Sequence, residues 1–516
     1  MPDFGVGSWP YRRARIDPHR LAMRGGETEL TYRALADRVD WLAGAMRAAG
    51  VRRGDRVAYL AANSMAGFET FFASGRLGAI FAPLNARLTT PELAYLVRDC
   101  EPRLLFHDGD QAHHLAELAG PGSPIAEVIA LGSEDAGGYE AFVQKGRAGQ
   151  ADQEPPEESV GLDDDAVILY TSGTTGKPKG AVLTHGNLTF NTMNQLAHAD
   201  VLGTDTALCI APLFHVTGLG QVSLPTFFKG GCVVVLPRFD PAAVLQAISS
   251  RRITSFSAVP TMLQMLCDHP AFAGTDLSSL RYVIYGGSMV AERVAVAWQR
   301  RGVVLLQGYG MTEASPGVYM AVPDGAVERP TSIGSPHFFT DVSLRSVSGH
   351  GQDERSGELL VRGPNVFRGY WNRPADTEQA LSDGWFRSGD VVRVDDSGWA
   401  YVVDRINDMI ISGGENIYPA EVESELNSLP GVLEGAVVAV PDEQWGEVGM
   451  AFIVASDGTA WDAQALRDAL DGRLAAYKIP KHVRVVPSLP KTATGKVRRQ
   501  DLRAAIAPLS ADGTAL

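Results

Sequence analysis

A loop of small and basic residues lies between two apolar runs near the end of the first third of the chain. It reads Tyr170-Thr-Ser-Gly-Thr-Thr-Gly-Lys-Pro-Lys-Gly180, with apolar residues at 166–169 before it and at 181–183 after it. Glycine lets a backbone approach a ligand closely and turn its N–H groups towards an anion. Hydroxyl groups add neutral donors, and the lysines add positive charge. We predict a cradle for a polyphosphate between two strands; a glycine-rich surface hairpin is the alternative.

This cradle differs from a Walker A loop. That motif requires Gly-Lys followed by Ser or Thr and then a helix. Here Pro178 follows Gly176-Lys177, and proline has no backbone N–H to donate. The candidate phosphate-binding residues are Thr171, Ser172, Gly173, Thr174, Thr175, Gly176, Lys177 and Lys179.

Strands and helices alternate through most of the chain. Thr31 is a plausible N-cap for a helix with apolar residues at 35, 39, 42 and 46, and Gly50 fits its end. A strand at 56–60 precedes a helix at 68–77, and comparable apolar strands follow at 233–236, 253–258, 282–285 and 303–306. Such alternation predicts an α/β fold: a large N-terminal domain of mostly parallel sheets flanked by helices.

A smaller α+β pattern begins after residues 404–408. A helix at 419–429 precedes strands at 435–440 and 450–455, a helix with Leu466 and Leu470, and a strand at 482–486. A chain of 516 residues is also longer than a single hydrophobic core usually supports. We therefore predict an N-terminal domain at 1–403, a hinge at 404–408 and a mobile C-terminal domain at 409–516.

Composition narrows the partners and the compartment. The net charge of −14 disfavours nucleic acid and anionic membranes, since both require basic surfaces. The four cysteines are widely spaced, as is typical of a reducing compartment. We find no signal-peptide pattern at the start and no apolar stretch of transmembrane length, so a cytoplasmic protein is expected.

Four further clusters carry chemistry. Tyr309-Gly-Met-Thr-Glu313 ends in a carboxylate suited to Mg²⁺, and Trp385-Phe-Arg-Ser-Gly-Asp390 ends in one suited to both hydroxyls of a ribose. Ser412-Gly-Gly-Glu-Asn-Ile-Tyr-Pro419 suits a close-fitting ligand tunnel. Pro490-Lys-Thr-Ala-Thr-Gly-Lys496 offers an ammonium that could stabilise a transferring phosphoryl group.

Each cluster alone has a structural explanation. Glu313 could cap a helix, Asp390 could belong to an ordinary turn, and Lys496 with Arg498 and Arg499 could form a solvated basic face. Their combined order along the chain favours one shared site.

In that order the five clusters resemble the motifs of the acyl-adenylate-forming enzymes: acyl-CoA ligases, luciferases and the adenylation domains of peptide synthetases. The resemblance extends from about residue 30 to about residue 506, and it is greatest to fatty-acyl-CoA and aryl-CoA ligases. It implies ATP and CoA as substrates and Mg²⁺ as cofactor.

The resemblance also implies roles for single residues. The cradle would hold the β- and γ-phosphates, with Thr171 and Glu313 near Mg²⁺, and Lys496 would be the catalytic lysine, bridging carboxylate and α-phosphate. Asn407 matches the hinge, where Lys or Asp is usual, and Ser388 replaces the commoner Thr. Further nucleotide contacts would come from Gly286, Gly287, Ser288, Tyr309, Gly310, Met311, Thr312, Asp390, Arg405 and Asn416. CoA contacts would come from Ser412, Gly413 and Gly414.

Two positions bear on the acid. His215 stands where amino-acid-activating relatives carry Asp, which argues against an α-amino acid; we expect a catalytic or gating role for it, with a packed core histidine as the alternative. Gly308 stands where malonate-activating relatives carry Arg, so a monocarboxylic acid is expected. The predicted acyl pocket consists of His215, Val216, Leu219, Val222, Tyr285, Gly308 and Met311.

The expected function is an acyl-CoA synthetase. ATP activates a monocarboxylic acid, foremost a medium- or long-chain fatty acid, to an acyl-AMP, and CoA then displaces AMP. Three alternatives stay open: a cinnamate- or benzoate-type aryl-CoA ligase, loading of a carrier-protein phosphopantetheine, and a luciferase-like oxygenase. A non-catalytic nucleotide-binding regulator is a fourth, although the presence of Lys496, Glu313 and the loop lysines argues against it.

Overall fold

The computed structural model describes residues 3–132, 138–149, 159–171, 178–287, 290–346, 355–405, 408, 410–412, 415–417, 419–442, 445–456, 459–471, 473–474, 476–492 and 495–506. The chain divides into two compact units. The first comprises Met1–Asp341 and Val361–Phe386, and the second comprises Val342–Leu360 and Arg387–Leu516.

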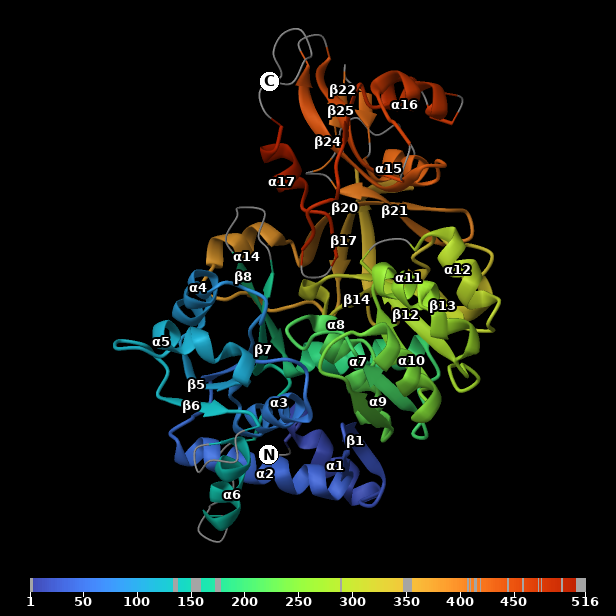
Figure 1. The fold of residues 1–516 in the computed structure, drawn as a ribbon. Helices are drawn as coiled ribbons and strands as arrows, with labels where there is room; N and C mark the ends of the chain where they lie inside the picture. Colours follow the sequence, from blue (N-terminus) through green and yellow to red (C-terminus); the bar gives the residue numbers. More distant parts are fainter. Residues whose placement is uncertain are drawn as a thin grey trace. The chain divides into compact units, whose positions relative to one another are not determined.

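The larger sheet of the first unit has nine strands in its described part, in the order β15-β14-β13-β12-β11-β9-β10-β1-β2 (Figure 1). The six strands from β13 to β1 are parallel, and the remaining strands join antiparallel at the two edges. Their bounds are β1 Leu21–Gly25, β2 Thr28–Thr31, β9 Thr206–Cys209, β10 Cys232–Val235, β11 Ser255–Ala258, β12 Tyr282–Gly286, β13 Val304–Gly310, β14 Gly317–Met320 and β15 Ser335–Pro336.

The second sheet of this unit has the order β18-β8-β7-β4-β3-β5-β6. Strands β7, β4, β3, β5 and β6 are parallel, whereas β8 and β18 are antiparallel to their neighbours. Their bounds are β3 Arg56–Leu60, β4 Ile80–Pro83, β5 Pro102–His107, β6 Glu127–Ala130, β7 Asp165–Thr171, β8 Lys179–Thr184 and β18 Gly369–Tyr370. The short β19, Leu381–Ser382, pairs with Trp385 and Phe386.

Helices join and cover these sheets. Their bounds are α1 Trp9–Ile16, α2 Tyr32–Ala48, α3 Met65–Leu77, α4 Thr90–Cys100, α5 Leu115–Leu118, α6 Tyr139–Ala148, α7 His185–His198, α8 Val216–Gly220, α9 Ser223–Lys229, α10 Pro241–Ser250, α11 Pro260–Asp268, α12 Glu292–Gln299, α13 Pro323–Ala326 and α14 Pro374–Ala380, with 3₁₀ turns η1 Val6–Ser8, η2 Gly109–His114, η4 Pro270–Gly274 and η5 Thr312–Ala314. The predicted alternation of strands and helices is thus confirmed. At α2, Thr31 caps Ala34 N–H as expected, and Leu35, Val39, Leu42 and Met46 are all buried.

The two faces of the nine-stranded sheet are covered by different helices. Successive side chains of a strand point to opposite faces. Val283, Tyr285 and Leu305 pack into an apolar cluster with residues of α10, α11 and α12. A Cβ built on Gly308 would instead lie 3.5 Å from Ile284 Cγ2 and 3.6 Å from Gln221 Nε2. Gly308 therefore faces the side that carries the segment after α8.

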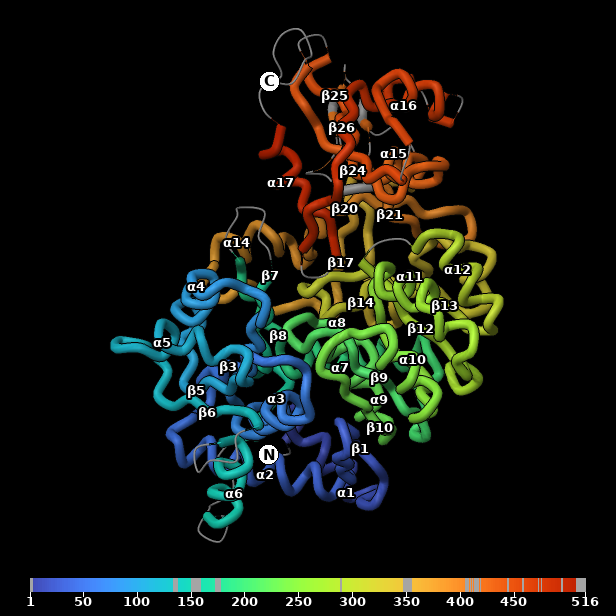
Figure 2. The backbone as a smooth tube through the Cα atoms, in the orientation of Figure 1, coloured from blue at the N-terminus to red at the C-terminus, as the bar shows by residue number. Residues whose placement is uncertain are grey.

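The second unit contains two groups of strands. Its C-terminal part is the orange and red trace of Figure 2. In the first, β20 pairs with β21; the second has the order β23-β22-β25-β24, with β26 parallel to β25. Its elements are β16 Asp341–Arg345, β17 Ser356–Arg362, β20 Trp385–Val394, β21 Ala400–Arg405, β22 Ile410–Ser412, β23 Glu415–Ile417, α15 Pro419–Asn427, β24 Val432–Asp442, β25 Gly446–Ala455, α16 Ala463–Leu470, η6 Ala476–Lys478, β26 His482–Val485 and α17 Arg499–Ala504. The second compact unit also takes in 342–360 and 387–403, and the division at residue 403 stays a prediction. The hinge at 404–408 stays a prediction.

Helix α7 buries a row of amide side chains that hold loops in place. Asn187 Nδ2 donates to the carbonyl oxygens of Pro364 (2.9 Å) and Val366 (2.7 Å). Asn191 Nδ2 donates to Gly220 O at 2.9 Å, and Asn191 Oδ1 accepts from Gly317 N–H at 3.1 Å. Asn194 Oδ1 accepts from Phe339 N–H at 2.8 Å, and its Nδ2 reaches Thr340 Oγ1 at 3.1 Å. Buried amides are stable only when paired, so this row fixes several loops to one rigid helix.

A chain of polar side chains continues from the end of α7. Gln195 Nε2 lies 3.5 Å from His337 Nε2, and His337 Nδ1 lies 3.0 Å from His198 Nδ1. Burial, with the neighbouring His198, lowers the pKa of His337 to about 3, so this ring is neutral near pH 7. An amide NH₂ group only donates, so His337 Nε2 accepts and His337 Nδ1–H donates to His198. Gly317 makes room for this arrangement, because a Cβ there would lie 2.6 Å from His337 Nε2.

Two substitutions in α7 should show that stability depends on whether the side chain removed had hydrogen-bond partners. Asn191→Leu would leave the buried Gly220 carbonyl and Gly317 N–H without partners, and we expect it to lower the free energy of unfolding by about 2–4 kcal/mol. The adjacent Thr192 is fully buried, and its hydroxyl has no hydrogen-bond partner in the described part of the chain. Thr192→Val should therefore change stability by less than about 1 kcal/mol. Denaturant unfolding of both variants tests this; equal losses would refute it.

The buried His337 should make stability depend on pH. The folded pKa of about 3 lies below the ordinary histidine pKa of about 6.5, so the unfolded chain binds an extra proton between these values and stability falls as pH falls through 6.5. At pH 5 the loss from this group is about 2 kcal/mol relative to pH 7. His337→Gln should flatten the dependence by that amount, whereas substitution of the exposed His19 should not. Unfolding free energies at pH 7 and pH 5 supply the measurement, and parallel pH profiles for wild type and His337→Gln would contradict it.

Candidate active site

The predicted phosphate cradle lies between the paired strands β7 and β8. Thr171, the last residue of β7, is the register partner of Lys179, the first residue of β8. The intervening residues Ser172 to Lys177 lie outside the described residues. Lys179 Nζ is 2.7 Å from Asp376 Oδ1 in α14 and lies over the Tyr370 ring at 5.4 Å. Lys179, at the end of the cradle that the structure describes, thus forms an ion pair with the carboxylate of Asp376.

Glu313 lies close to this end of the cradle. Tyr370 OH donates to Glu313 Oε1 at 2.8 Å, and Tyr370 belongs to β18, which pairs with β8. Burial and the Glu313 charge raise the pKa of Tyr370, which keeps its hydroxyl a donor. Asn365 Nδ2 holds the following turn through the carbonyl oxygens of Ala314 (3.1 Å) and Gly317 (2.8 Å). Two predicted magnesium ligands, Glu313 and Thr171, are therefore connected through Tyr370 and Lys179.

Two glycine turns end the neighbouring parallel strands β12 and β13. Gly286 and Gly308 are register partners, and a Cβ on Gly286 would lie 2.7 Å from the Gly308 carbonyl oxygen. Gly287 has a φ of +92°, which L side chains rarely adopt. Only glycine is therefore compatible with this close approach of backbones, while Ser288 lies outside the described residues. The Tyr309 ring is half-buried and meets Tyr319 edge-on at 6.1 Å.

Gly310, Met311 and Thr312 link β13 to η5, directly before Glu313. A Cβ on Gly310 would overlap the Pro316 carbonyl oxygen, and Met311 N–H donates to the same oxygen at 3.0 Å. The residues predicted for the nucleotide thus occupy the carboxyl ends of adjacent strands, where ligands bind in α/β sheets.

The residues predicted for the acyl pocket divide between two faces of the sheet. Val216 and Leu219 lie in α8, and Val222 follows it; all three are buried. Gly308 faces the segment after α8, as described above, but the Tyr285 side chain packs on the opposite face, in the cluster of α10 to α12. There its hydroxyl donates to Gln307 Oε1 at 3.1 Å. The structure therefore does not bring Tyr285 together with Gly308 and α8.

His215 occupies the N-cap position of α8. It is half-buried, and its ring meets that of Phe214 at 4.8 Å. Its carbonyl oxygen accepts from Gly218 N–H at 2.9 Å. This placement next to Val216 is compatible with the predicted gate of the acyl pocket.

In the second unit, the two residues predicted to hold the ribose lie opposite each other. Asp390 of β20 is the register partner of Arg405 of β21. Asp390 is buried, and its N–H donates to Ser388 Oγ at 3.1 Å. Ser388 in turn donates to Leu359 O at 2.7 Å. The hydroxyl of Ser388, at the position where the resembled enzymes usually carry threonine, thus holds this turn.

Lys496 belongs to a tight turn of the same unit. Its N–H donates to Thr492 Oγ1 at 3.2 Å, its carbonyl accepts from Thr492 N–H at 2.7 Å, and its side chain is exposed. Among the predicted CoA and nucleotide contacts, Ser412 is buried in β22 and Asn416 lies in β23. Gly413, Gly414 and Asn407 lie outside the described residues.

Arg499, three residues after Lys496, belongs to a network of ion pairs. It contacts Glu423 (2.7 Å) and Asp408 (3.4 Å), and Arg503 also contacts Asp408, at 3.0 Å. Arg499 is therefore not part of a solvated basic face. These ion pairs connect α17, which follows Lys496 in the sequence, with Asp408, the last residue of the predicted hinge segment.

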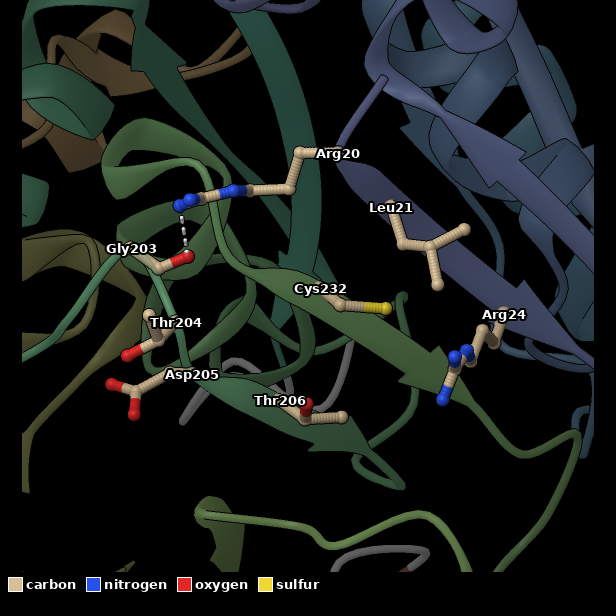
Figure 3. Close-up of a pocket in the computed structure, with 8 residues that line it drawn as sticks. All are labelled: Arg20, Leu21, Arg24, Gly203, Thr204, Asp205, Thr206 and Cys232. Carbon is tan, nitrogen blue, oxygen red and sulfur yellow. Dashed lines mark hydrogen bonds between the residues drawn. The ribbon is translucent and has the colours of Figure 1, made fainter. Parts of the chain in front are cut away.

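A surface hollow of about 300 Å³ lies elsewhere in the first unit (Figure 3). Thr206, Cys232 and Leu21 at its edge are the first residues of β9, β10 and β1. Across it, Arg20 Nη1 donates to Gly203 O at 2.8 Å. The hollow is at the amino ends of the strands, whereas Gly286 and Gly308 are at carboxyl ends, so it does not coincide with the predicted site.

Several residues around the site escaped prediction from sequence. Asn191, Gln221, Asn365 and Tyr370 all hold or flank its turns, yet each is an ordinary polar residue in isolation. One signal was available: Asn187, Asn191 and Asn194 recur at helical spacing within α7, and such a row in a buried helix requires polar partners.

In the described part of the chain, no group of three or more His, Cys, Asp and Glu residues is arranged to hold a metal ion. None of the described helices combines the length and hydropathy needed to cross a bilayer.

Comparison with known proteins identifies the family. The model for AMP-binding enzymes matches residues 11–371, and the model for the C-terminal domain of AMP-binding enzymes matches residues 421–496. A feruloyl-CoA synthase of Amycolatopsis sp is 49% identical over 504 residues, which cover 98% of this chain and 99% of that protein. The indoleacetate–CoA ligase of Aromatoleum aromaticum is 41% identical over 511 residues, with 97% and 98% covered.

A solved structure, a Mycobacterium tuberculosis fatty acyl CoA synthetase, superposes with a TM-score of 0.78 at 32% identity, covering 97% of this chain and 98% of that one. The fold class predicted from sequence is thereby confirmed, as is the resemblance to adenylate-forming enzymes. The chain belongs to the family of AMP-binding enzymes and is an acid–CoA ligase of the adenylate-forming superfamily.

Proposed function

We propose that this enzyme activates an aromatic monocarboxylic acid with ATP and transfers the acyl group from AMP to CoA. The observation that carries the proposal is the similarity, over nearly the whole chain, to proteins named feruloyl-CoA synthase and indoleacetate–CoA ligase. This favours the aryl alternative over the medium- or long-chain fatty acid that was the leading expectation from sequence.

The chemistry follows from the poor leaving group of a carboxylate. A carboxylate oxygen attacks the α-phosphate of ATP, pyrophosphate leaves, and the acyl-AMP formed is then attacked by the CoA thiol, which expels AMP. Glu313 and Thr171 offer the oxygen ligands that Mg²⁺ prefers, and Mg²⁺ would neutralise phosphate charge there. A side chain on Gly286 would collide with the Gly308 carbonyl, so glycine lets these two strand ends lie close together at the edge where ligands bind in α/β sheets.

Residues of the second unit complete the proposed site. Asp390 and Arg405 would hold the ribose, and Lys496 would stabilise the charge that develops at the α-phosphate. The thiol must later reach the same carbonyl carbon, so Lys496 would have to leave. A rotation at residues 404–408, with Asn407 as hinge, would convert the arrangement for adenylation, with Lys496 at the site, into the arrangement for thioester formation. Ser412, Gly413 and Gly414 would then contact the pantetheine arm.

CoA is the acceptor that we favour. The names of both relatives specify CoA, and nothing in the described residues supports the carrier-protein alternative. The cytoplasm remains the expected compartment for a reaction that consumes ATP and CoA.

A panel of acids tests the proposed substrate class. ATP–pyrophosphate exchange should proceed at least tenfold faster, by kcat/KM, with hydroxycinnamates or indoleacetate than with octanoate or palmitate. When CoA is added, the same acids should yield the aryl–CoA thioester and AMP. A preference for the fatty acids would refute the aryl assignment while leaving the ligase activity intact.

Substitution of the lysine separates the two half-reactions. Lys496→Ala should lower acyl-AMP formation by at least 100-fold, because an ammonium would be lost where charge builds up. Thioester formation from supplied acyl-AMP should fall by less than tenfold. Lys491→Ala, on the same segment, serves as the control and should leave both steps nearly unchanged. Equal losses in both half-reactions of Lys496→Ala would contradict the role.

A further inference from the structure

Lys496 is carried by a hairpin that continues directly into α17. Thr492 N–H donates to Lys496 O at 2.7 Å, and Lys496 N–H donates back to Thr492 Oγ1 at 3.2 Å. Arg498 N–H donates to Pro490 O at 2.8 Å, which joins the two arms once more. Because these bonds hold the hairpin together, the position of Lys496 within the second unit depends on what holds the start of α17.

Arg499, the first residue of α17, is held by a largely buried carboxylate. Its Nη2 donates to both oxygens of Glu423 in α15, at 2.9 and 2.7 Å. Glu423 Oε1 also accepts from Val437 N–H of β24 at 2.8 Å. The exposed fractions of the Arg499 and Glu423 side chains are 22% and 16%. Glu423 therefore connects the start of α17 both to α15 and to the sheet of this unit.

Asp408 extends this pair into a network of two carboxylates and two guanidinium groups. Arg499 Nη1 lies 3.4 Å from Asp408 Oδ2, and Arg503 Nη2 lies 3.0 Å from Asp408 Oδ1. Arg499 thus uses different nitrogens for its two carboxylates. A planar guanidinium that is bound in this way has a fixed orientation as well as a fixed position.

The network adds orientation more than stability. Removal of charged groups from water is costly, and apolar side chains of similar volume often stabilise a fold at least as well. An apolar anchor is already present in the same helix, since Leu502 is 3% exposed and packs with residues of β24 and β25. The ion pairs of Arg499 lie closer in sequence to Lys496 and are the directional contacts of this helix start.

We propose that Glu423 and Arg499 are positioning residues for Lys496 in the adenylation step. By fixing the start of α17, they set where the hairpin presents the ammonium group to the α-phosphate. This inference rests on the proposed role of Lys496 and deepens it. A reacting group that is misplaced by about 1 Å can slow a step by about 100-fold. Thioester formation, for which Lys496 has left the site, does not depend on this placement.

Glu423→Gln tests the proposal in the full-length enzyme, because it removes the charge but keeps an acceptor for Val437 N–H. We expect kcat for acyl-AMP formation to fall by about 10- to 100-fold, and thioester formation from supplied acyl-AMP to change by less than about threefold. Arg499→Lys keeps the charge but not the planar group, so it should show the same selectivity with a loss of about 3- to 10-fold. It serves as the second variant if Glu423→Gln does not fold.

Glu425→Gln is the matched control. Glu425 lies in the same helix as Glu423 and pairs with Arg473 at 3.5 Å, but the two side chains are 38% and 47% exposed. Exposed ion pairs contribute little, so both half-reactions should stay within about twofold of wild type.

A double variant separates positioning from a general loss of structure. If Glu423 acts through Lys496, adding Glu423→Gln to Lys496→Ala should slow acyl-AMP formation no further. A structural defect would instead slow the double variant by the same factor as the wild type. That additive loss would overturn the proposal, as would equal losses in both half-reactions or wild-type rates in Glu423→Gln and Arg499→Lys. If Lys496→Ala itself has no selective effect on adenylation, the proposed role of the lysine has failed instead.

Discussion

The pairing of buried amide groups along α7 is the interaction on which the rest of the first unit depends. A helix that buries Asn187, Asn191 and Asn194 is stable only if their donors and acceptors find partners, because an unpaired buried polar group costs more than a typical hydrogen bond contributes. The partners are backbone groups of β14, of the end of α8, and of two loops, at 364–366 and at 339. One helix thereby sets the positions of segments that are far apart in sequence, and the turn that carries Glu313 is among the segments joined to this framework.

The same constraint divides the nine-stranded sheet into two functional faces. On one face, Val283, Tyr285 and Leu305 pack with α10 to α12 into an apolar cluster that serves stability. On the other, Gly308 lies beside Ile284 and Gln221, and the polar chain that starts at His198 reaches Gln221 there.

Much of the fold could be predicted from local pattern. Helix α2 begins after Thr31 and buries the four apolar residues expected, and strand β3 occupies residues 56–60 as predicted, because capping and periodicity act within one element. Strand ends were less accurate: β24 begins at Val432 rather than at residue 435, since edge pairing with β25 extends it. The make-up of the compact units depends on tertiary grouping, since 342–360 belong with the second unit while 361–386 belong with the first.

The sequence by itself determined the family: glycine, hydroxyl, lysine and carboxylate residues occur in an order that resembles the motifs of adenylate-forming enzymes. Only the tertiary structure decided which of them meet. Asp390 and Arg405 became register partners, and Glu313 came to lie beside Tyr370. Tyr285 and Gly308, separated by 23 positions in the sequence, were placed on opposite faces of one sheet. The physical reason is that the face on which a side chain lies depends on strand register and alternation, which are set by pairing between segments and not by any residue alone.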